Sequence, residues 1–245
     1  MNLNIETINV ITPFKNYKNK NINKTINSLI KLSSFIKVNH IVIYDLIASR
    51  NISEIISKFE NKKYPNFFFK AISTDQKGIY SAINIGLNTI SFESYYIVLG
   101  EGDLIKNKKN YLFIKKSKII LIDYELSQSH ITKKLRNLYS GMPYCHNAII
   151  FKNNGLKYNT NYRISSDYDY LIKYLKKESI NFKKIKDYFL NDFIYTIFES
   201  KEGISSKSKF TKYYENLKIS SKNFGIYGLF YFLFFYIKKI SKLGN

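Results

Sequence analysis

Residues 67–103, FFFKAISTDQKGIYSAINIGLNTISFESYYIVLGEGD, contain the pattern that decides the fold. The apolar run 67–72 predicts a buried strand, and residues 79–90 repeat apolar side chains at the period of a helix. Residues 95–99 predict a second strand, which ends at the turn-like residues 100–103. A strand, a helix and a strand in this order are typical of two parallel strands joined by a crossover helix.

The same alternation fills the chain before this stretch. Residues 8–11 predict a strand, and the apolar side chains of residues 22–30 fall at i, i+4, i+7 and i+8, which predicts a helix. Residues 40–44 predict a further strand, and residues 52–56 predict a short helix after it. The sequence therefore predicts an α/β fold, with a mainly parallel sheet that helices cover on both faces.

The second half of the chain is less regular. It predicts strands at residues 118–123 and 145–151 and a helix at residues 167–177, and the Ser/Lys-rich residues 202–209 are typical of a loop. Adjacent residues of a strand point to opposite faces, so we do not expect Cys145 and His146 to share a proton. Cys145 is expected to be a small buried hydrophobic residue.

Polar residues follow each strand of the predicted parallel sheet. They are residues 12–16, Asp45, residues 74–76 and residues 101–103. Sheets of this kind bind ligands at the carboxyl ends of their strands, so these loops predict a ligand site. Asp and Gly are also common turn residues, and taken singly each loop fits that simpler interpretation.

Composition excludes several classes of protein. The 245 residues include 45% hydrophobic ones, enough to bury a core, which excludes fibrous and wholly disordered chains. A single cysteine excludes a disulfide-stapled secreted domain and favours a reducing cytosol. The net charge of +21 favours phosphate-rich partners, but arginine, the preferred reader of base edges, occurs only at Arg50, Arg136 and Arg163. We therefore expect no nucleic-acid partner, and interpret most lysines as a solvated surface.

The ends of the sequence bear on localisation. The opening MNLNIETINVITPF lacks a basic segment followed by an apolar one, so no signal peptide is expected. No run reaches the roughly 18–20 apolar residues of a membrane-spanning helix. The uncharged run 224–237, FGIYGLFYFLFFYI, comes nearest, and lysines flank it on both sides. Aromatic rings beside lysines are typical of a membrane interface, so we expect shallow docking on an anionic membrane surface, with a terminal helix packed on the core as the alternative.

Seven segments then match, in chain order, the motifs of one family. They are VITPFKN (10–16), IVIYD (41–45), TDQKGIYSAINIGL (74–87), LGEGD (99–103), MPYCHN (142–147), ISSDYDYLIK (164–173) and GISS (203–206) with Glu215 downstream. Together they resemble the bacterial family 2 glycosyltransferases, and most closely the colanic-acid and amylovoran type. The resemblance implies a GT-A, Rossmann-like fold with a C-terminal acceptor-side lobe and an apolar helical tail.

The resemblance also implies an activity and a setting. These are inverting enzymes that move a sugar from a nucleotide-sugar donor, here expected to be UDP-linked, to a growing surface glycan. The expected acceptor is a glycan or a polyprenyl-diphosphate-linked molecule of capsule, exopolysaccharide or lipopolysaccharide synthesis. The expected place is the inner face of the bacterial cytoplasmic membrane, as a peripheral protein. Residues 1–125 would form the nucleotide-sugar-binding half, residues 126–200 the acceptor-side half, and residues 201–245 a loop and tail.

Site residues follow from the matched motifs. The residues implied in donor binding are Thr12, Pro13, Asn16, Asp45, Asp75, Gln76, Gly78, Tyr80 and Asn84. Asp45 would contact the nucleobase, the ring of Tyr80 would pack on the nucleotide, and Asn84 would bond to backbone or phosphate. The residues implied on the acceptor side are His146, Asn147 and Ser205. For His146, a purely structural hydrogen bond is an equal alternative.

Two further carboxylates carry the chemistry that the resemblance implies. Asp103 would hold a divalent cation, Mn²⁺ or Mg²⁺, which stabilises the departing diphosphate as a Lewis acid. Glu101 would be a second ligand, or else a solvated turn carboxylate. Asp167 would be the general base that deprotonates the acceptor, and a Ser-Ser-Asp before an apolar run is also typical of a helix N-cap. Asp169 is expected to be only a first-turn carboxylate.

The sequence departs from the family pattern at several motif positions. Residues 46–50, LIASR, replace a glycine-containing polar turn after Asp45, and Gln76 stands where the family has an Asp. Ser81 replaces another Asp, and Gly100-Glu101 opens the metal motif in place of Asn-Ser. These departures keep a second hypothesis open, a catalytically degenerate, membrane-associated binding protein built on the same fold.

Overall fold

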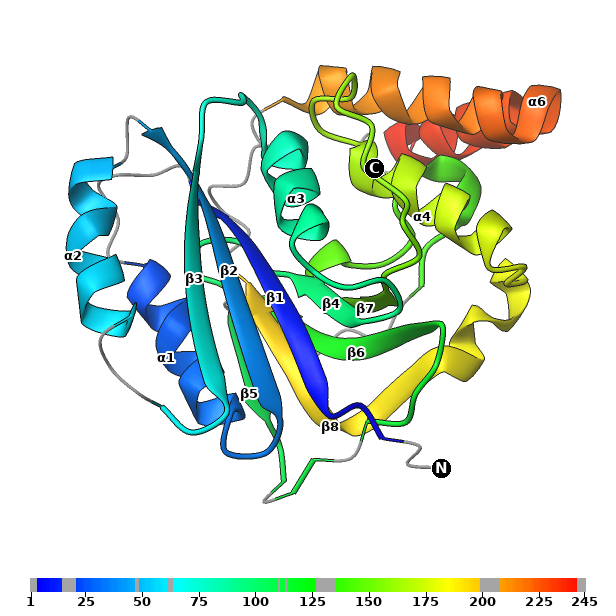
Figure 1. Cartoon of the computed structure of the whole chain (residues 1–245). Helices are drawn as coiled ribbons and strands as arrows, with labels where there is room; N and C mark the ends of the chain where they lie inside the picture. Colours follow the sequence, from blue (N-terminus) through cyan, green and yellow to red (C-terminus); the bar gives the residue numbers. More distant parts are fainter. Residues whose placement is uncertain are drawn as a thin grey trace.

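A single mixed sheet organises the molecule (Figure 1). The computed structural model describes residues 4–14, 21–46, 49–60, 64–109, 111–112, 114–126, 135–198 and 208–241. The strands are β1 (Thr7–Phe14), β2 (Lys37–Asp45), β3 (Phe67–Thr74), β4 (Tyr95–Val98), β5 (Leu104–Asn107), β6 (Ile119–Leu126), β7 (Ile149–Lys152) and β8 (Phe189–Phe198). The α-helices are α1 (Ile22–Leu32), α2 (Ser49–Glu60), α3 (Ile79–Asn88), α4 (Ser166–Lys177) and α6 (Lys209–Ser241). Short 3₁₀ helices are η2 (Leu138–Ser140), η3 (His146–Ala148) and η4 (Phe182–Tyr188).

The sheet has a parallel part and a mixed part. Its strand order is β3-β2-β1-β4-β7-β6-β8-β5. The pairs β2–β3, β1–β2 and β1–β4 are parallel, as the alternation of strands and helices predicts. Beyond β4, the pairs β4–β7, β6–β7 and β5–β8 are antiparallel and β6–β8 is parallel. The predicted α/β class is confirmed, and the antiparallel pairs make the sheet mixed.

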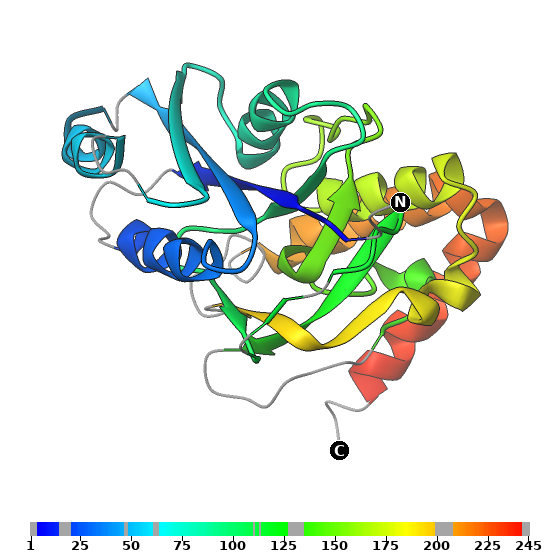
Figure 2. The same cartoon turned by 60° about the horizontal axis from the view of Figure 1, so that its bottom comes forward.

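The sheet curls around α1. Strand β5 follows β4 directly in the chain but pairs with β8 at the far end of the strand order. Helix α1 packs against both β5 and β2, although these strands lie far apart in that order. In Figure 2 the strands of the mixed part bend away below the parallel part. The curl therefore brings the strand after residues 100–103 back beneath the first half of the chain.

Helices cover both faces of the parallel part. Side chains alternate along β2, so that Val38 and Val42 join the core shared with α1 and α2, while Ile41 and Ile43 pack in a smaller cluster with Ala82 of α3. Figure 1 shows α1 and α2 on one side of these strands and α3 on the other. This arrangement confirms the predicted helical cover on both faces.

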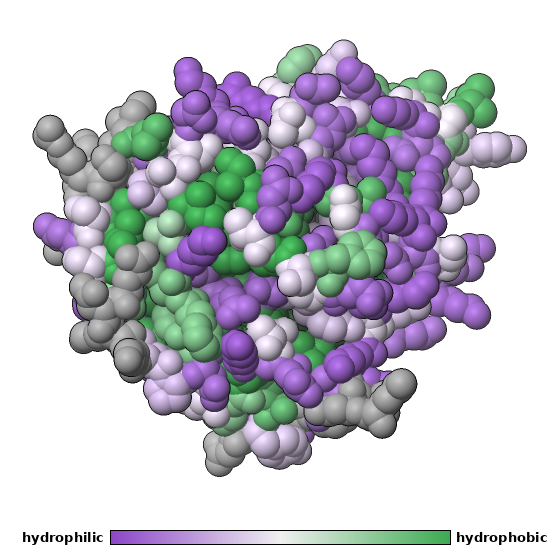
Figure 3. Space-filling model, viewed as in Figure 1, coloured by the Kyte–Doolittle hydropathy of each residue, from purple (hydrophilic) through white to green (hydrophobic). Residues whose placement is uncertain are grey.

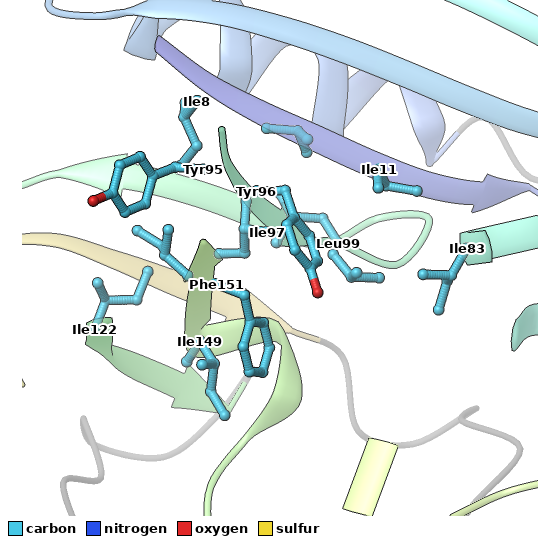
Figure 4. Packing of buried hydrophobic residues seen from close by; sticks show 14 of the residues in the cluster. Ile8, Ile11, Ile83, Tyr95, Tyr96, Ile97, Leu99, Ile122, Ile149 and Phe151 are labelled. Atoms are coloured by element: carbon cyan, nitrogen blue, oxygen red, sulfur yellow. The ribbon is translucent and has the colours of Figure 1, made fainter. Parts of the chain in front are cut away.

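The central core lies between β1, β4, β6 and β7. Figure 4 shows apolar side chains of these strands packed together with Ile83 of α3. Tyr96 and Phe151 are fully buried, and their rings stack with centroids 5.6 Å apart. Burying a side chain of this size contributes about 1.5–3 kcal/mol of hydrophobic free energy. The core thus joins the parallel part to the mixed part, and one sheet includes strands from both of the predicted halves, 1–125 and 126–200. That division stays a prediction.

The region around Cys145 differs from the prediction. Strand β7 begins at Ile149, and residues 146–148 form η3, with Cys145 as the residue before it. The prediction of a strand over 145–151 is therefore wrong for its first part. Cys145 and His146 do not alternate across a sheet, and the thiol is half-buried.

The C-terminal segment is a kinked helical hairpin. Within α6, Gly225 has φ 60° and ψ −144°, a conformation outside the helical region that glycine adopts without strain from a Cβ atom. The two arms pack closely against each other. The Ser220 hydroxyl donates to the carbonyl of Gly228 (3.2 Å), and the ring centroids of Tyr213 and Tyr236 lie 4.9 Å apart. Among the described helices, none is sufficiently long and apolar to span a bilayer.

Candidate functional site

The parallel strands bring the predicted donor loops to one edge. Because β1, β2, β3 and β4 run in the same direction, their carboxyl ends meet at the same edge of the sheet. Asp45 ends β2 and pairs in register with Thr74, which ends β3. The next polar residues, Asp75 and Gln76, are exposed, and the Thr74 hydroxyl accepts the N–H of Gln76 (3.0 Å). Gly78 follows with φ +103°, a left-handed conformation, immediately before α3.

The first donor motif lies deeper than the loops. Thr12 is fully buried within β1, and its hydroxyl is 3.0 Å from Nε2 of His40 on β2. Burial lowers the pKa of His40 to about 3, so its ring is neutral at physiological pH. Pro13 also lies within β1 and is half-buried, and Asn16 lies outside the described residues. The donor roles of these residues stay predictions.

Two of the predicted donor residues fasten α3 to the segment before α4. The Asn84 carboxamide donates to the carbonyl of Tyr158 (2.9 Å) and accepts its N–H (2.8 Å). Tyr80 is buried, and its hydroxyl donates to the carbonyl of Ile164. These bonds join α3 to the segment that enters α4. Donor binding by both residues stays a prediction. The sequence left a backbone or a phosphate partner open for Asn84, and the structure shows a backbone partner.

A column of aromatic rings supports this connection. Tyr80 stacks on Tyr158 at 5.8 Å, and Tyr158 stacks on Tyr170 of α4 at 4.1 Å. The Tyr158 hydroxyl is 2.7 Å from Nε2 of His146. Burial lowers the pKa of His146 to about 4, so this ring is neutral at pH 7 and is held by the column. The sequence offered no signal for Tyr158, since a lone tyrosine between turn residues belongs to no matched motif.

The metal-motif loop is closed by a hydrogen bond from the second half. Asp103 is buried, and its Oδ2 accepts the N–H of Gly100 (2.6 Å) and a side-chain N–H of Asn147. Glu101 lies in the same turn with its Oε1 atom buried. Within the described residues, no three His, Cys, Asp or Glu side chains gather to hold a metal ion by themselves. Asp103 and Glu101 lie in one turn, however, and a divalent cation can bind to one or two carboxylates while substrate phosphates supply its other ligands.

Asp167 lies in the first turn of α4. It is half-buried, and its Oδ1 accepts the N–H of Tyr168 (2.9 Å). Burial raises the pKa of Asp167 to about 6, and the Tyr168 N–H and the charge of Lys212 hold it from rising further. Ser165, not Asp167, is the N-cap residue, and it makes no side-chain capping bond. Asp169 is buried and forms an ion pair with Lys173 (2.6 Å), so it does more than lie in the first turn.

The charges of both candidate carboxylates act on the Cys145 thiol. Burial of the thiol is the main cause that raises its pKa to about 12, and the charges of Asp103 and Asp167 both contribute. The metal-motif carboxylate and the candidate base therefore both lie within electrostatic reach of one side chain. Asn147, two residues further on, donates to Asp103, so this segment of the second half contacts the metal-motif loop directly. Ser205, the third predicted acceptor residue, lies outside the described residues.

Two surface cavities are lined by other residues. One, of about 560 Å³, is formed by α1 and β5 and includes Lys24, Lys31 and Lys106. The other, of about 420 Å³, lies around Tyr95 and Lys152. Neither contains a predicted site residue, so the case for the site rests on the strand ends and the side-chain contacts described above.

The fold itself is that of known sugar-transferring enzymes. No protein-family model matches the chain, and no curated protein matches it in sequence. Among solved structures, the chain has a GT-A-like fold similar to that of glycosyltransferases.

Two of these glycosyltransferases illustrate the likeness. S. aureus TarS 1-349 in complex with UDP-GlcNAc gives a TM-score of 0.59 at 16% identity, covering 93% of this chain and 71% of that one. The mannosyltransferase PcManGT from Pyrobaculum calidifontis, in complex with GDP-Man and Mn²⁺, gives 0.54 at 9% identity, covering 88% and 63%. At such identities the likeness establishes the fold.

Proposed function

We propose that this protein is a glycosyltransferase that moves a sugar from a nucleotide-sugar donor to a glycan acceptor. The observation that carries the proposal is the edge where the parallel strands β1–β4 end, together with the buried Asp103 in the loop after β4, which Asn147 of the second half contacts. The solved structures of this fold support it, because TarS is described in complex with UDP-GlcNAc and PcManGT with GDP-Man and Mn²⁺.

The proposed general base is Asp167. A base with a pKa of about 6 is ionised at neutral pH, yet it binds a proton more readily than an ordinary aspartate. Inverting transfer requires such a base, which takes the proton of the acceptor hydroxyl as the oxygen attacks the anomeric carbon from the face opposite the nucleotide. The proton moves to the carboxylate of Asp167, the bond from the acceptor oxygen to the sugar forms, and the bond from the sugar to the diphosphate breaks.

The donor site is proposed at the ends of β1–β4. Asp45 would contact the nucleobase, and the exposed Asp75, Gln76 and Gly78 would border the nucleotide. Asp103 and Glu101 are oxygen donors of the kind that hold Mn²⁺ or Mg²⁺ together with donor phosphates, and the metal would neutralise the charge of the departing diphosphate. The assignment to family 2, to the colanic-acid and amylovoran type and to a UDP-linked donor rests on the motif resemblance.

A thermal-shift experiment tests the donor site. The full chain is heated with UDP, GDP, CMP or dTDP, each with and without Mn²⁺. A nucleotide at about 100 times its Kd stabilises a protein by about 2.7 kcal/mol, so one nucleotide should raise the Tm in a Mn²⁺-dependent manner. Asp103→Asn should abolish the Mn²⁺-dependent part, whereas Asp187→Asn, at an exposed position of η4, should not.

The alternative is a degenerate binding protein, and one observation favours it. Oδ2 of Asp103 already accepts two N–H groups, from Gly100 and Asn147, which compete with a metal ion for the same oxygen. If no nucleotide raises the Tm of the folded chain, with or without Mn²⁺, the transferase proposal is wrong and this alternative stands.

We also propose that the α6 hairpin docks on an anionic membrane surface. Its second arm exposes large apolar side chains, among them Ile226 (65% exposed), Phe230 (64%) and Ile237 (66%). Figure 3 shows hydrophobic residues at the upper right, where Figure 1 places α6. Lys218 and Lys222 are exposed on the first arm of the same hairpin. Apolar side chains beside lysines match the acyl boundary and the phosphates of a lipid surface, which fits a lipid-linked acceptor and a peripheral protein at the inner face of the cytoplasmic membrane.

Liposome flotation tests this surface. The full chain should float with vesicles of phosphatidylcholine and phosphatidylglycerol, and much less with phosphatidylcholine alone. The double variant Ile226→Ser, Phe230→Ser should lose flotation because it removes exposed apolar area without touching the core. The matched control Phe92→Ser, at another exposed phenylalanine outside α6, should float like the parent chain. Equal flotation of all three chains would show that the hairpin is not the docking surface.

A further inference from the structure

Glu215 is a buried carboxylate on the first arm of α6, far in sequence from the segment that it contacts. It is 7% exposed. Its Oε1 accepts the N–H of Arg163 (2.7 Å), and its Oε2 accepts the N–H groups of Ile164 (2.9 Å) and Ser165 (2.8 Å). Three consecutive backbone N–H groups therefore point at one carboxylate, and hydrogen bonds to an ionised acceptor are stronger than neutral ones.

The segment held by Glu215 leads directly into the turn that carries Asp167. Ser165 is the N-cap residue of α4, and its side chain makes no capping bond, so the helix start is secured from outside. The carbonyl of Ile164 accepts the Tyr80 hydroxyl from α3 on the opposite side. The backbone before Asp167 is thus held by side chains of α6 and α3. Among the described side chains, Glu215 makes the most hydrogen bonds to this backbone segment.

The same face of α6 also presents a cation to the candidate base. Lys212 precedes Glu215 by three residues, so the two side chains lie on one side of the helix. The charge of Lys212 lowers the pKa of Asp167, which places its ammonium group within electrostatic reach of the carboxylate. The first arm of α6 therefore contacts the base region through the backbone and through charge.

We propose that Glu215 is a positioning residue, which holds the backbone of residues 163–165 so that Asp167 faces the acceptor. This inference rests on the proposed function, since it assigns Glu215 to the transfer reaction. Glu215 touches neither substrate nor the reacting atoms in this role and acts through the main chain. It also makes the first arm of α6 a part of the proposed catalytic frame, whereas the second arm carries the exposed residues Ile226, Phe230 and Ile237.

Hydrogen exchange of the full chain tests the hydrogen bonds directly. In Glu215→Gln, the amide group offers one oxygen and one N–H₂ in place of two acceptor oxygens, so the bonds to residues 163–165 cannot all form. The amides of Arg163, Ile164 and Ser165 should exchange at least about tenfold faster than in the parent chain, while amides of β1 and β4 stay unchanged. Tyr214→Phe, at the exposed neighbouring position, is the matched control and should leave all of them protected. Unchanged protection in Glu215→Gln would overturn the inference.

Kinetics separate positioning from a merely structural role. With the donor identified by thermal shift, Glu215→Gln should lower kcat by roughly 10- to 100-fold and leave the KM for the nucleotide-sugar unchanged, because a misplaced base slows chemistry without affecting the donor loops. Glu215→Asp keeps the charge but shortens the side chain by one methylene group, so this variant should recover part of kcat. If Glu215→Gln does not fold, Glu215→Asp is compared with the parent chain in its place.

The outcomes for the two proposals are distinct. A parent chain that transfers no sugar from any donor overturns the proposed function and the role of Glu215 in it. An active parent chain with an equally active Glu215→Gln variant overturns the role of Glu215 alone. A fall in kcat accompanied by an equal rise in KM would also contradict positioning, since it would indicate general damage to the site.

Discussion

Two regions hold the proposed site carboxylates in different ways: the proposed donor-side edge, where β1–β4 end, and the proposed acceptor-side frame, the residues of α3, α4 and α6 around Asp167. On the donor side, Asp45 and Asp75 lie at or just after the ends of neighbouring parallel strands, where the fold alone brings them together. The backbone just before Asp167 is instead held by side chains that are distant in sequence, Tyr80 of α3 and Glu215 of α6. Strand order is therefore sufficient to place the proposed binding edge, whereas the proposed base depends on long-range contacts from other elements.

The largest expected effect is the loss of the base. Asp167→Asn should lower the transfer rate by about 10²- to 10⁴-fold, the usual contribution of general base catalysis. Nucleotide binding at the donor edge should remain, because that edge does not depend on the carboxylate. Retained activity in this variant would remove Asp167 from the mechanism, and loss of nucleotide binding would show that the two regions are not separable.

The same substitution should stabilise the fold. The pKa of Asp167 is about 6 in the folded state against 3.8 as the ordinary value, so the folded chain binds this proton more tightly than the unfolded chain. Stability is therefore lost as the pH rises through this window, by up to about 3 kcal/mol above pH 6.

Measuring the Tm as a function of pH tests this loss of folding stability. Asp167→Asn should melt several degrees higher than the parent chain at pH 7.5, and the gap should close towards pH 4. Asp75→Asn, at an exposed donor-side position, is the control and should follow the parent chain at both pH values. An equal or lower Tm for Asp167→Asn at pH 7.5 would show that the site imposes no such cost.

A smaller effect is expected at the joint between the two regions. Asn84→Ala removes both side-chain bonds to the Tyr158 backbone, which should cost about 2 kcal/mol in unfolding free energy. Asn88→Ala, at the exposed end of the same helix, should cost much less. Urea denaturation measures the stability of both variants, and nucleotide affinity distinguishes the two roles of Asn84. An unchanged Kd assigns Asn84 to the backbone, whereas a loss of about tenfold supports the predicted phosphate contact.

Particular residues show how far the sequence alone predicts this molecule. The strands and helices from β1 to β4 were predictable, because short apolar runs and helix-period segments alternate there and each element forms from its own residues. Strands β5 and β8 were missed because their pairing depends on the curl of the sheet, and no local period signals a curl. The first part of the strand predicted at residues 145–151 was wrong for a related reason. Residues 146–148 form η3, in which Asn147 contacts Asp103, a residue distant in sequence.

The site divides in the same way. The strand-end residues Asp45, Asp75 and Gln76 could be assigned to one edge from the strand order alone. The family resemblance indicated Asp167 as the base. It also included Glu215, downstream of the GISS motif, but assigned no role to that residue. Neither Tyr158 nor Lys212 could be found, because Tyr158 acts through contacts with Asn84 and Tyr80 of α3, and Lys212 through the charge that it presents to Asp167. In both cases the segments are more than forty residues apart, so no local spacing in the sequence signals the contact.

The smallest effect concerns the charge that α6 presents to the base. Among the described residues, the groups that bear on Asp167 include its own N–H and that of Tyr168, Tyr80 of α3, Tyr158 of the aromatic column, the Cys145 thiol and Lys212 of α6. Lys212 is the cation among them, and it lowers the pKa of Asp167. Lys212→Met should therefore raise this pKa and move the acid limb of the pH–rate profile upward by a few tenths of a unit to about one unit. Lys212→Arg should restore the limb, and Lys218→Met, at an exposed position of the same arm, should leave it in place. An unmoved limb in Lys212→Met would show that the acceptor-side frame supplies geometry to the base without tuning its charge.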